Sequence, residues 1–220
     1  MSIHNFSIDD TSMHLGTCVT EISDLGVLID NKLSFTSHIN RVVAQASVRA
    51  NLIKKCFVSK DVSTLIHAYK VYVRPLLEYA TCVWFPSHSN AIHQIERLQR
   101  KFTKGLPSFG QLSYLDRLSK SKLESLEVRR LHNDLIMTYK VLAGLVDVDA
   151  DGFFSYANSG HNTRGHCLKL LGHQCRVNTR KFFFTERVVE PWNSLPATAL
   201  DFSSLSKFKT FLKRLILVNF

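Results

Sequence analysis

Residues 90–104, NAIHQIERLQRKFTK, show the pattern that governs most of this 220-residue chain. The apolar residues of the stretch recur every three or four positions, which places them on one face of an α-helix. They are Ile92, Ile95, Leu98 and Phe102. Four cations fall near the opposite surface, namely Arg97, Arg100, Lys101 and Lys104. The stretch therefore predicts a helix with one buried side and one basic side, ended by the Gly-Leu-Pro sequence at 105–107.

The same periodicity recurs along the chain and predicts a mainly α-helical protein. Further helices are expected over 36–57, 61–75, 113–119, 126–145, and from Ser203 or Ser204 onward. Thr36 or Ser37 is the expected cap of the first of these and Asp61 that of the second, because such side chains accept backbone hydrogen bonds at helix starts. Pro75 should kink or end the second helix.

Two of these helices carry expectations about which side is buried. The inner face of the helix that begins near Asp61 should consist of Leu65, Ala68, Tyr69, Tyr72 and Val73. The inner face of 126–145 should consist of Leu131, Leu135, Tyr139 and Leu142. Arg129 and Arg130 are expected on its outer side, since charged residues rarely lie inside.

Residues 12–35 show a β pattern instead. Short apolar runs at 14–20 and 25–29 are punctuated by glycine, and Asp30-Asn31 is a turn signal. The region predicts a small N-terminal β-hairpin. A lone two-stranded hairpin is marginal in water, so it must pack on the helices that follow or on strands that precede it.

The segment RVNTRKFFFTERVVEPWNSLP, residues 176–196, predicts a short C-terminal helix with an aromatic side and a basic side, stopped by Pro196. Consecutive aromatics are more often core than stacking platforms, so the phenylalanines at 182–184 are expected chiefly inside. The preceding residues 146–178, acidic at first and then rich in His and Gly, resemble a linker.

Composition indicates an ordinary globular chain with a basic bias. Hydrophobic residues make up 45% and charged residues 21%, which excludes a disordered polymer. The 28 Lys and Arg against 18 Asp and Glu give a net charge of +10, and a field of that sign attracts nucleic acid or an acidic membrane surface. A mildly basic helical protein kept soluble by its charge is the plainer alternative.

Targeting signals and cysteine usage favour an intracellular protein, nuclear or cytoplasmic. The five cysteines are odd in number and irregularly spaced, without a CxxC pair, which indicates free thiols in a reducing compartment. The polar N-terminal sequence MSIHNFSIDD is not a secretory signal, and no apolar run reaches the roughly 18–20 residues that span a bilayer. No membrane association is expected.

Several separated motifs resemble, in the same order, the C-terminal portion of the reverse transcriptases of non-LTR retrotransposons (LINE-type, jockey-like). The first set is DLGV at 24–27, ID at 29–30, LSF at 33–35 and HI at 38–39. The second set is YK at 69–70, VRPLLEYA at 73–80, VW at 83–84 and IERLQRKFTK at 95–104. The last set is LEVRRL at 126–131, TRGH at 163–166 and WNSLP at 192–196.

The resemblance runs from about residue 15 to the C terminus and implies thumb-like helices that grip template RNA and nascent duplex. It divides the chain into a palm-end hairpin remnant at 1–35, a helical thumb-like domain at 36–145, a linker at 146–178, and an aromatic and basic helical segment at 179–220. In that family the paired aspartates that hold two metal ions lie well upstream of the Leu-Gly-Val strand. Asp9-Asp10 lies too close to that strand to fill the role, so we expect a truncated fragment without catalytic residues, not an enzyme on its own.

Metal and cofactor motifs are weak. Residues 147–152, DVDADG, match the first half of an EF-hand loop, but Asn158 stands where the bidentate glutamate should be. Five potential zinc ligands lack the spacing of a structural site, namely His161, His166, Cys167, His173 and Cys175. No Gly-rich phosphate loop, GxSxG or HExxH is present. No metal site and no cofactor are expected.

The expected function is sequence-tolerant binding of RNA or an RNA–DNA duplex through the phosphate backbone, unless the chain is a non-functional relic. The residues expected to contact phosphates are Arg97, Arg100, Lys101, Lys104, Arg129, Arg130, Arg180 and Lys181. The alternative is a protein-interaction or self-association module without a nucleic-acid role. In that case the apolar segment 76–85 and the unpaired hairpin edge would drive association.

Overall fold

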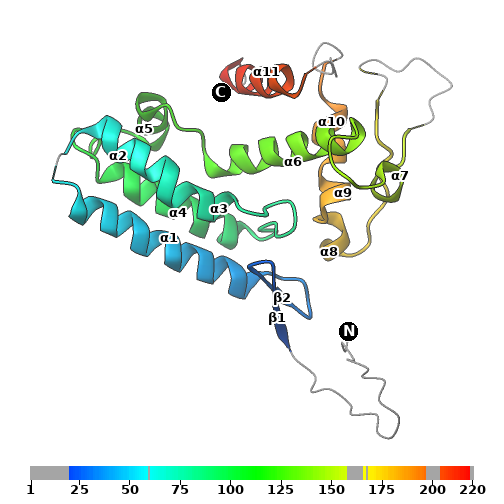
Figure 1. Cartoon of the computed structure of the whole chain (residues 1–220), viewed down its shortest axis with the longest axis horizontal. Coiled ribbons are helices and arrows are strands. Elements are labelled where there is room, and N and C mark those ends of the chain that lie inside the picture. Colours follow the sequence, from blue (N-terminus) through cyan, green and yellow to red (C-terminus); the bar gives the residue numbers. More distant parts are fainter. Residues whose placement is uncertain (1–19, 59, 158–165, 167, 197–203, 219–220) are drawn as a thin grey trace, which may run out of the picture.

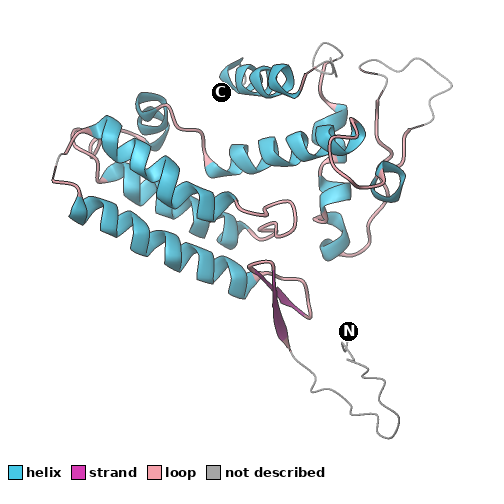
Figure 2. Ribbon diagram, in the orientation of Figure 1, coloured by secondary structure: helices cyan, strands magenta, loops and turns pink. Residues whose placement is uncertain are grey.

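The computed structural model describes residues 20–58, 60–157, 166, 168–196 and 204–218, and within them the protein is mainly α-helical with one small antiparallel hairpin. Figure 1 and Figure 2 show the hairpin beside the start of the first long helix, with the remaining helices above it. The predicted fold class is therefore confirmed. None of the described helices combines the length and apolar character that a bilayer crossing requires.

The hairpin consists of β1 (Glu21–Asp24) and β2 (Val27–Asp30), with Glu21 opposite Asp30. Leu25 and Gly26 form the turn, and both have the positive φ that tight hairpin turns require. The second strand therefore begins at Val27, later than predicted. Residues 14–19 of the predicted first strand lie outside the described residues.

The loop after β2 is held by the Asp30 carboxylate, which accepts hydrogen bonds from the backbone N–H groups of Lys32, Ser34 and Phe35. Helix α1 (Thr36–Cys56) follows directly, and its N-cap is Phe35, with φ 54° and no side-chain cap. The prediction of Thr36 or Ser37 as cap was wrong. The Asp30 carboxylate instead accepts a hydrogen bond from the backbone N–H of Phe35, the residue that precedes the helix.

Helix α2 (Val62–Ala68) begins as predicted at Asp61, whose carboxylate accepts from the Thr64 N–H at 2.8 Å. It continues through a π-helical turn, η1 (Tyr69–Val73), into α3 (Arg74–Glu78). Pro75 has no N–H to donate. Because the π-turn before it is wider than an α-helical turn, the helix continues past Pro75 instead of ending there.

The π-turn changes which side chains face the core. Tyr69 and Val73 are fully buried, as predicted, but Tyr72 is 55% exposed. The placement of Tyr72 on the inner face was therefore wrong. A regular 3.6-residue period would have kept it inside, and the inserted residue of the π-turn rotates it to the surface.

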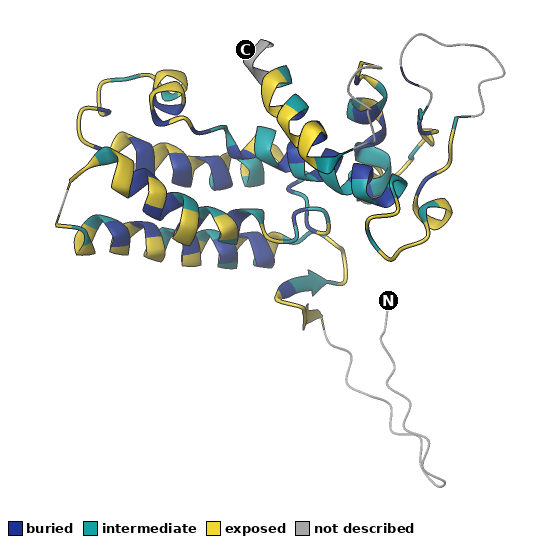
Figure 3. Ribbon diagram, turned by 45° about the horizontal axis from the view of Figure 1, so that its top comes forward, coloured by how far each residue is buried: buried dark blue, intermediate teal, exposed yellow. Residues whose placement is uncertain are grey.

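Three more helices complete the first half: α4 (Ser89–Lys104), α5 (Tyr114–Ser121) and α6 (Leu126–Leu142). All three match predicted ranges closely. Ser113 and Ser125 cap α5 and α6 through their hydroxyls. Figure 3 shows the alternating buried and exposed bands along these helices, as expected for helices packed on one side. The hydrophobic core of this half extends from Val27 to Leu126.

The second half is built on α6 and the C-terminal segment. Its short helices are α7 (Ala150–Phe153), α8 (Asn178–Lys181), α9 (Phe184–Arg187) and α10 (Val189–Asn193), followed by α11 (Leu205–Val218). The single helix predicted at 176–196 is thus three short ones, because Phe183 adopts an extended conformation between α8 and α9. Phe154 and Leu170 are buried in this core, so the predicted linker also contributes to packing.

Arg187 joins the two halves. Its guanidinium forms a buried ion pair with Asp134 of α6, through Nε–Oδ2 and Nη2–Oδ1 contacts of 2.9 Å each. It also donates to the carbonyl oxygens of Thr81 and Cys82 and lies 4.4 Å over the Phe85 ring. One side chain therefore fixes the C-terminal segment both to α6 and to the loop after α3.

Candidate nucleic-acid interface

Helix α4 separates its residues into an inner polar-apolar side and an outer basic side. Ile95, Leu98 and Phe102 are buried, together with Glu96 and Gln99. The four predicted cations are all exposed: Arg97, Arg100, Lys101 and Lys104. Their spacing of i, i+3, i+4 and i+7 places them in one row along the helix.

This row has no acidic counterpart. Among the described residues, none of the four cations takes part in an ion pair. The Arg100 guanidinium lies 4.5 Å over the Tyr114 ring, which supports it at the surface without neutralising it. The row can therefore meet an external anion without first breaking an internal salt bridge.

Helix α1 extends the basic surface beside α4. Gln94 donates to the Asn40 side chain at 2.9 Å near one end, and Lys54 Nζ donates to the Lys101 carbonyl at 3.3 Å near the other. The two helices thus run parallel and in contact. Burial lowers the pKa of the Lys54 ammonium, and the neighbouring charge of Lys101 lowers it further. Cations crowded in this way repel one another, and a bound phosphate would relieve that repulsion.

Helices α1 and α4 together carry a strong excess of positive charge. Helix α1 contains no Asp or Glu, and the single acid of α4, Glu96, is buried. Against it stand eight cations: Arg41, Arg49, Lys54, Lys55, Arg97, Arg100, Lys101 and Lys104. Sequence reasoning missed Lys54 and Lys55 as candidates, although the absence of acids from 36–56 was a readable signal. Most of the net charge of +10 resides on these two helices.

Arg129 occupies a different environment. It forms a bidentate ion pair with Glu78 of α3, and its Nη1 lies 3.1 Å from Glu124 Oε2. Burial alone would lower the pKa of Arg129, but these carboxylates raise it. The side chain holds α6 against α3 and is not a free cation for phosphate.

The placement of Arg130 on the outer side of α6 was wrong. Only 1% of the residue is exposed, and its Nε, Nη1 and Nη2 atoms have no hydrogen-bond partner among the described residues. Leu131, predicted inside, is 39% exposed. Leu135 and Tyr139 are buried as predicted, and the buried side of α6 also includes Leu126, Arg130 and Asp134 at four-residue spacing.

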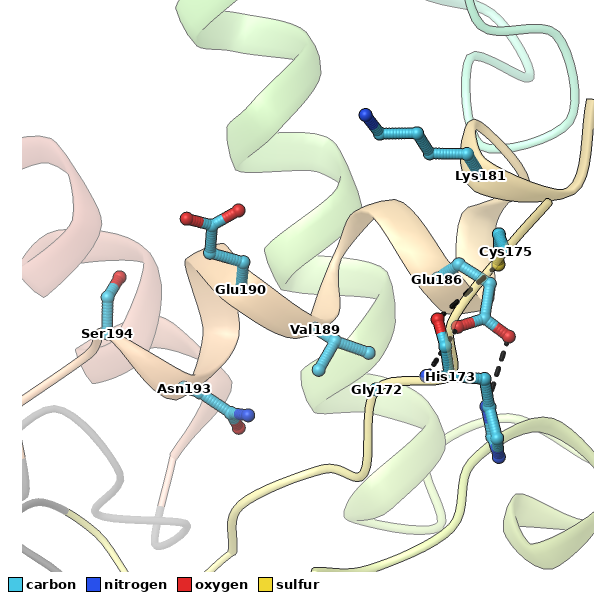
Figure 4. A pocket seen from close by; sticks show the side chains of 9 residues that line it. All are labelled: Gly172, His173, Cys175, Lys181, Glu186, Val189, Glu190, Asn193 and Ser194. Atoms are coloured by element: carbon cyan, nitrogen blue, oxygen red, sulfur yellow. Dashed lines mark hydrogen bonds and ion pairs between the residues drawn. The ribbon is translucent and has the colours of Figure 1, made fainter. Parts of the chain in front are cut away.

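Arg180 and Lys181 lie apart from the α1–α4 surface, on α8. Arg180 Nη2 is 3.0 Å from Glu186 Oε1, and the same oxygen lies 3.2 Å from His173 Nδ1. Lys181 is exposed at the edge of a pocket of about 680 Å³ between the 172–175 segment and α8–α10. Figure 4 shows Lys181 pointing away from the His173–Glu186 pair. The structure thus separates the eight predicted residues into one unpaired row on α4, one buried or paired set on α6, and a remote pair on α8.

The residues of the separate motifs contact one another. Tyr69 donates its hydroxyl to the Gln99 side chain at 2.9 Å, linking 69–70 to 95–104. Glu96 accepts from the Leu126 N–H at 3.0 Å, which anchors the start of the 126–131 motif. Glu78 of the 73–80 motif is the partner of Arg129 in the same way. Buried residues of these motifs therefore form a structural network, whereas the cations of the 95–104 motif are exposed.

The WNSLP motif at 192–196 is also structural. Trp192 is fully buried and donates its indole N–H to the Leu168 carbonyl at 2.8 Å. The Asn193 amide both accepts from the Leu170 N–H and donates to the Leu170 carbonyl. His166 Nε2 lies 3.0 Å from the Trp192 carbonyl oxygen. These bonds fasten the 166–170 segment to α10.

Of the three consecutive phenylalanines, only Phe184 is buried. The Phe182 ring stacks on Phe85 at a centroid distance of 6.4 Å, and Phe183 is 50% exposed. Together with Leu33, Val83 and Phe153 they line an apolar cleft of about 610 Å³ between the β2–α1 loop, the 82–88 loop and α6. The expectation that 182–184 are core is thus met by one residue, while the other two line a cleft.

Two weak metal-ligand patterns occur in the sequence, at 147–152 and 161–175, and neither was expected to form a site. In the described part of the chain, no three His, Cys, Asp or Glu side chains come together as a metal ion requires. Asp149 caps the short helix α7 by accepting from the Asp151 N–H. His161 and Cys167 lie outside the described residues.

The chain is similar to an uncharacterized protein of Caenorhabditis elegans, with 29% identity over 127 residues. The match covers 56% of this chain and 64% of that protein, so the chain spans less than two thirds of the relative. No protein family and no solved structure matches the chain. The similarity therefore carries no activity to this protein.

Proposed function

We propose that this protein binds RNA or an RNA–DNA duplex through the phosphate backbone, and that it does so as a thumb-like relative of LINE-type reverse transcriptases. The observation that carries the proposal is the row of exposed, unpaired cations on α4: Arg97, Arg100, Lys101 and Lys104. Lys54 of α1 adjoins the row at the Lys101 end. The role proposed for these residues is binding, not polymerisation.

The chemistry of the row favours binding to the phosphate backbone of a nucleic acid over recognition of a particular base sequence. Lysine and arginine side chains on an open helix surface neutralise phosphates, whereas sequence is read by groups that reach base edges. The row spans eight residues, from Arg97 to Lys104, and is roughly 10 Å long at 1.5 Å per residue. At about 3.4 Å per nucleotide in one strand, it can face a few successive phosphates.

The contacts between the motifs support the role proposed for α4. Tyr69 contacts Gln99, Glu78 contacts Arg129, and Glu96 contacts the start of α6. These contacts hold the buried side of α4 against its neighbours and leave its cations at the surface. The proposed relation to reverse transcriptases rests on the order of the motifs in the sequence.

The test is fluorescence anisotropy of a labelled RNA hairpin and an RNA–DNA duplex with the purified protein across a salt series. We expect a linear fall of log affinity with log salt, and a slope reduced by about 0.9 for each phosphate contact removed. The Arg100→Glu/Lys101→Glu variant should lose affinity for both ligands and show a shallower slope.

The matched control is Lys213→Glu/Arg214→Glu, which makes the same change in net charge on two exposed cations of α11. Equal losses in both variants would show that only the overall charge matters and that α4 is not the binding surface. Absence of binding by the unmodified protein at low salt would remove the proposal altogether.

The apolar cleft between the β2–α1 loop and α8–α9 favours a second candidate, self-association. Leu33, Val83, Phe153 and Phe183 are each about half exposed around it, which is unusual for a monomer surface. Light scattering without nucleic acid tests this candidate. A mass that rises with concentration in the unmodified protein, and not in a Val83→Asp/Phe183→Asp variant, would favour it.

A further inference from the structure

A second exposed face of the helical half combines two tyrosines with two arginines. Tyr72 lies in η1 and Tyr79 directly follows α3, and the two residues are 55% and 57% exposed. Arg41 and Arg49 lie on the side of α1 that faces this segment. Figure 1 and Figure 3 both show α1 running beside it.

Hydrogen bonds place each arginine near one tyrosine, directly for Arg49 and through the hairpin turn for Arg41. Arg49 Nη1 donates to the Tyr72 carbonyl at 3.3 Å. Arg41 Nη2 donates to the Gly26 carbonyl at 2.5 Å, and the Tyr79 hydroxyl donates to the Leu25 carbonyl at 2.9 Å. Arg41 and Tyr79 therefore hold the same hairpin turn, and the face carries two Arg–Tyr pairs.

The two pairs are separated by a distance that suits a strand. Arg41 and Arg49 are eight residues apart in α1, which corresponds to about 12 Å along that helix. Exposed Val48 and Leu52 of α1 lie between or beside the pairs, and α1 contributes no acid. This face lies on the side of α1 away from Asn40 and Lys54, which contact α4.

We propose that this face binds an unpaired RNA or DNA strand, with bases stacked on Tyr72 and Tyr79 and phosphates near Arg41 and Arg49. The inference rests on the proposed function and adds a surface specific for single strands, distinct from the backbone row on α4. Aromatic rings beside cations are the usual platform for unpaired bases, and stacking tolerates any sequence. A duplex cannot use the platform, because its bases are already stacked on one another.

The π-turn explains why an aromatic side chain is available there at all. A regular helix would have kept Tyr72 on the inner face with Tyr69 and Val73. The wider turn presents the Tyr72 ring to solvent while leaving its two neighbours buried. Such turns are frequent at functional sites.

The experiment uses the full chain and a single-stranded RNA oligonucleotide that carries 2-aminopurine, whose fluorescence is quenched by stacking. Tyr72→Ala/Tyr79→Ala should weaken binding of the oligonucleotide by at least about fivefold per tyrosine and abolish the protein-induced change in fluorescence. Tyr72→Phe/Tyr79→Phe keeps both rings and should bind like the unmodified protein. This control also covers the loss of the Tyr79 hydroxyl bond to the hairpin turn.

Duplex binding by the same variants separates this inference from the proposed function. Unchanged affinity for an RNA–DNA duplex in the alanine variant, together with loss of single-strand binding, supports the inference. Equal loss for duplex and single strand, or unchanged single-strand binding, overturns it while leaving the α4 row in place. If the unmodified protein binds neither ligand, both proposals fail.

Discussion

Helices α4 and α6 are alike in length and in carrying clustered arginines, yet they use these residues in opposite ways. In α4 the cations are exposed and form no ion pair within the described part of the chain, whereas in α6 Arg129 is paired with Glu78 and Arg130 is buried. Asp134, also on the inner side of α6, pairs with Arg187. Positive charge alone therefore does not single out a candidate binding surface; the lack of an acidic partner among the described residues is the second criterion.

The largest effect is expected from breaking the Arg187–Asp134 pair that makes α6 a structural helix. Arg187→Leu leaves the Asp134 carboxylate buried without its partner and frees two loop carbonyls, so the free energy of unfolding should fall by about 3–5 kcal/mol. Urea denaturation followed by circular dichroism measures it.

The double variant Asp134→Leu/Arg187→Leu serves as the control for that loss. Because it removes both charges at once, it should be destabilised by less than the sum of the two single variants. Additive losses would mean that the pair does not couple α6 to the C-terminal segment.

A smaller effect, of opposite sign, is expected at Arg130. Its guanidinium is buried without a hydrogen-bond partner among the described residues, and burial lowers its pKa although Glu96, Glu127 and Asp134 oppose this. Arg130→Met keeps the packing and removes the desolvated charge, so the free energy of unfolding should rise by about 1 kcal/mol.

Arg100→Met on α4 is the matched substitution. It should change stability by less than about 0.5 kcal/mol, since exposed side chains contribute little, but it should weaken RNA binding. A destabilised Arg130→Met protein that still binds RNA normally would show that the nearby carboxylates, and not a missing partner, decide the energy of Arg130.

The same contrast explains how much of the protein could be predicted from sequence. The range and sidedness of α4 were predictable because its polar inner residues, Glu96 and Gln99, are flanked by strong apolar positions at helical spacing. In α6 the buried side also contains Arg130 and Asp134, so the hydrophobic pattern correctly indicated Leu135 and Tyr139 but missed the buried charged residues. Hydrophobic periodicity does not predict the burial of a charged residue, because that burial depends on a partner elsewhere in the sequence. For Asp134 the partner is Arg187.

Local departures of the backbone from regular helix geometry and capping account for the other errors of prediction from sequence. The π-turn at Tyr69–Val73 could not be read from a 3.6-residue period, and Tyr72 was consequently placed inside. The cap of α1 was misassigned because Asp30, six residues before the helix, already binds the loop amides. The α4 row was predictable as a candidate site, whereas the contribution of Lys54 required the contact between α1 and α4.

The smallest effect concerns histidines on the two helices and depends on pH. His132 of α6 is buried, and burial lowers its pKa below 6.5, with Glu124 opposing and Arg129 and Lys213 adding to the decrease. A lowered pKa means that the folded protein binds the proton less tightly than the unfolded chain. Stability linked to His132 is therefore complete above about pH 6.5 and declines as the pH falls toward the folded-state pKa.

His93 of α4 is exposed and provides the matched control. Urea denaturation of the unmodified protein, His132→Gln and His93→Gln at pH 7.5 and 5.5 should show a smaller acid-induced loss of stability only in His132→Gln. The reason is that a charge gained by the buried His132 side chain must be desolvated, whereas the His93 side chain is exposed at the surface. Equal losses in all three proteins would place the acid sensitivity elsewhere and weaken the distinction between the two helices.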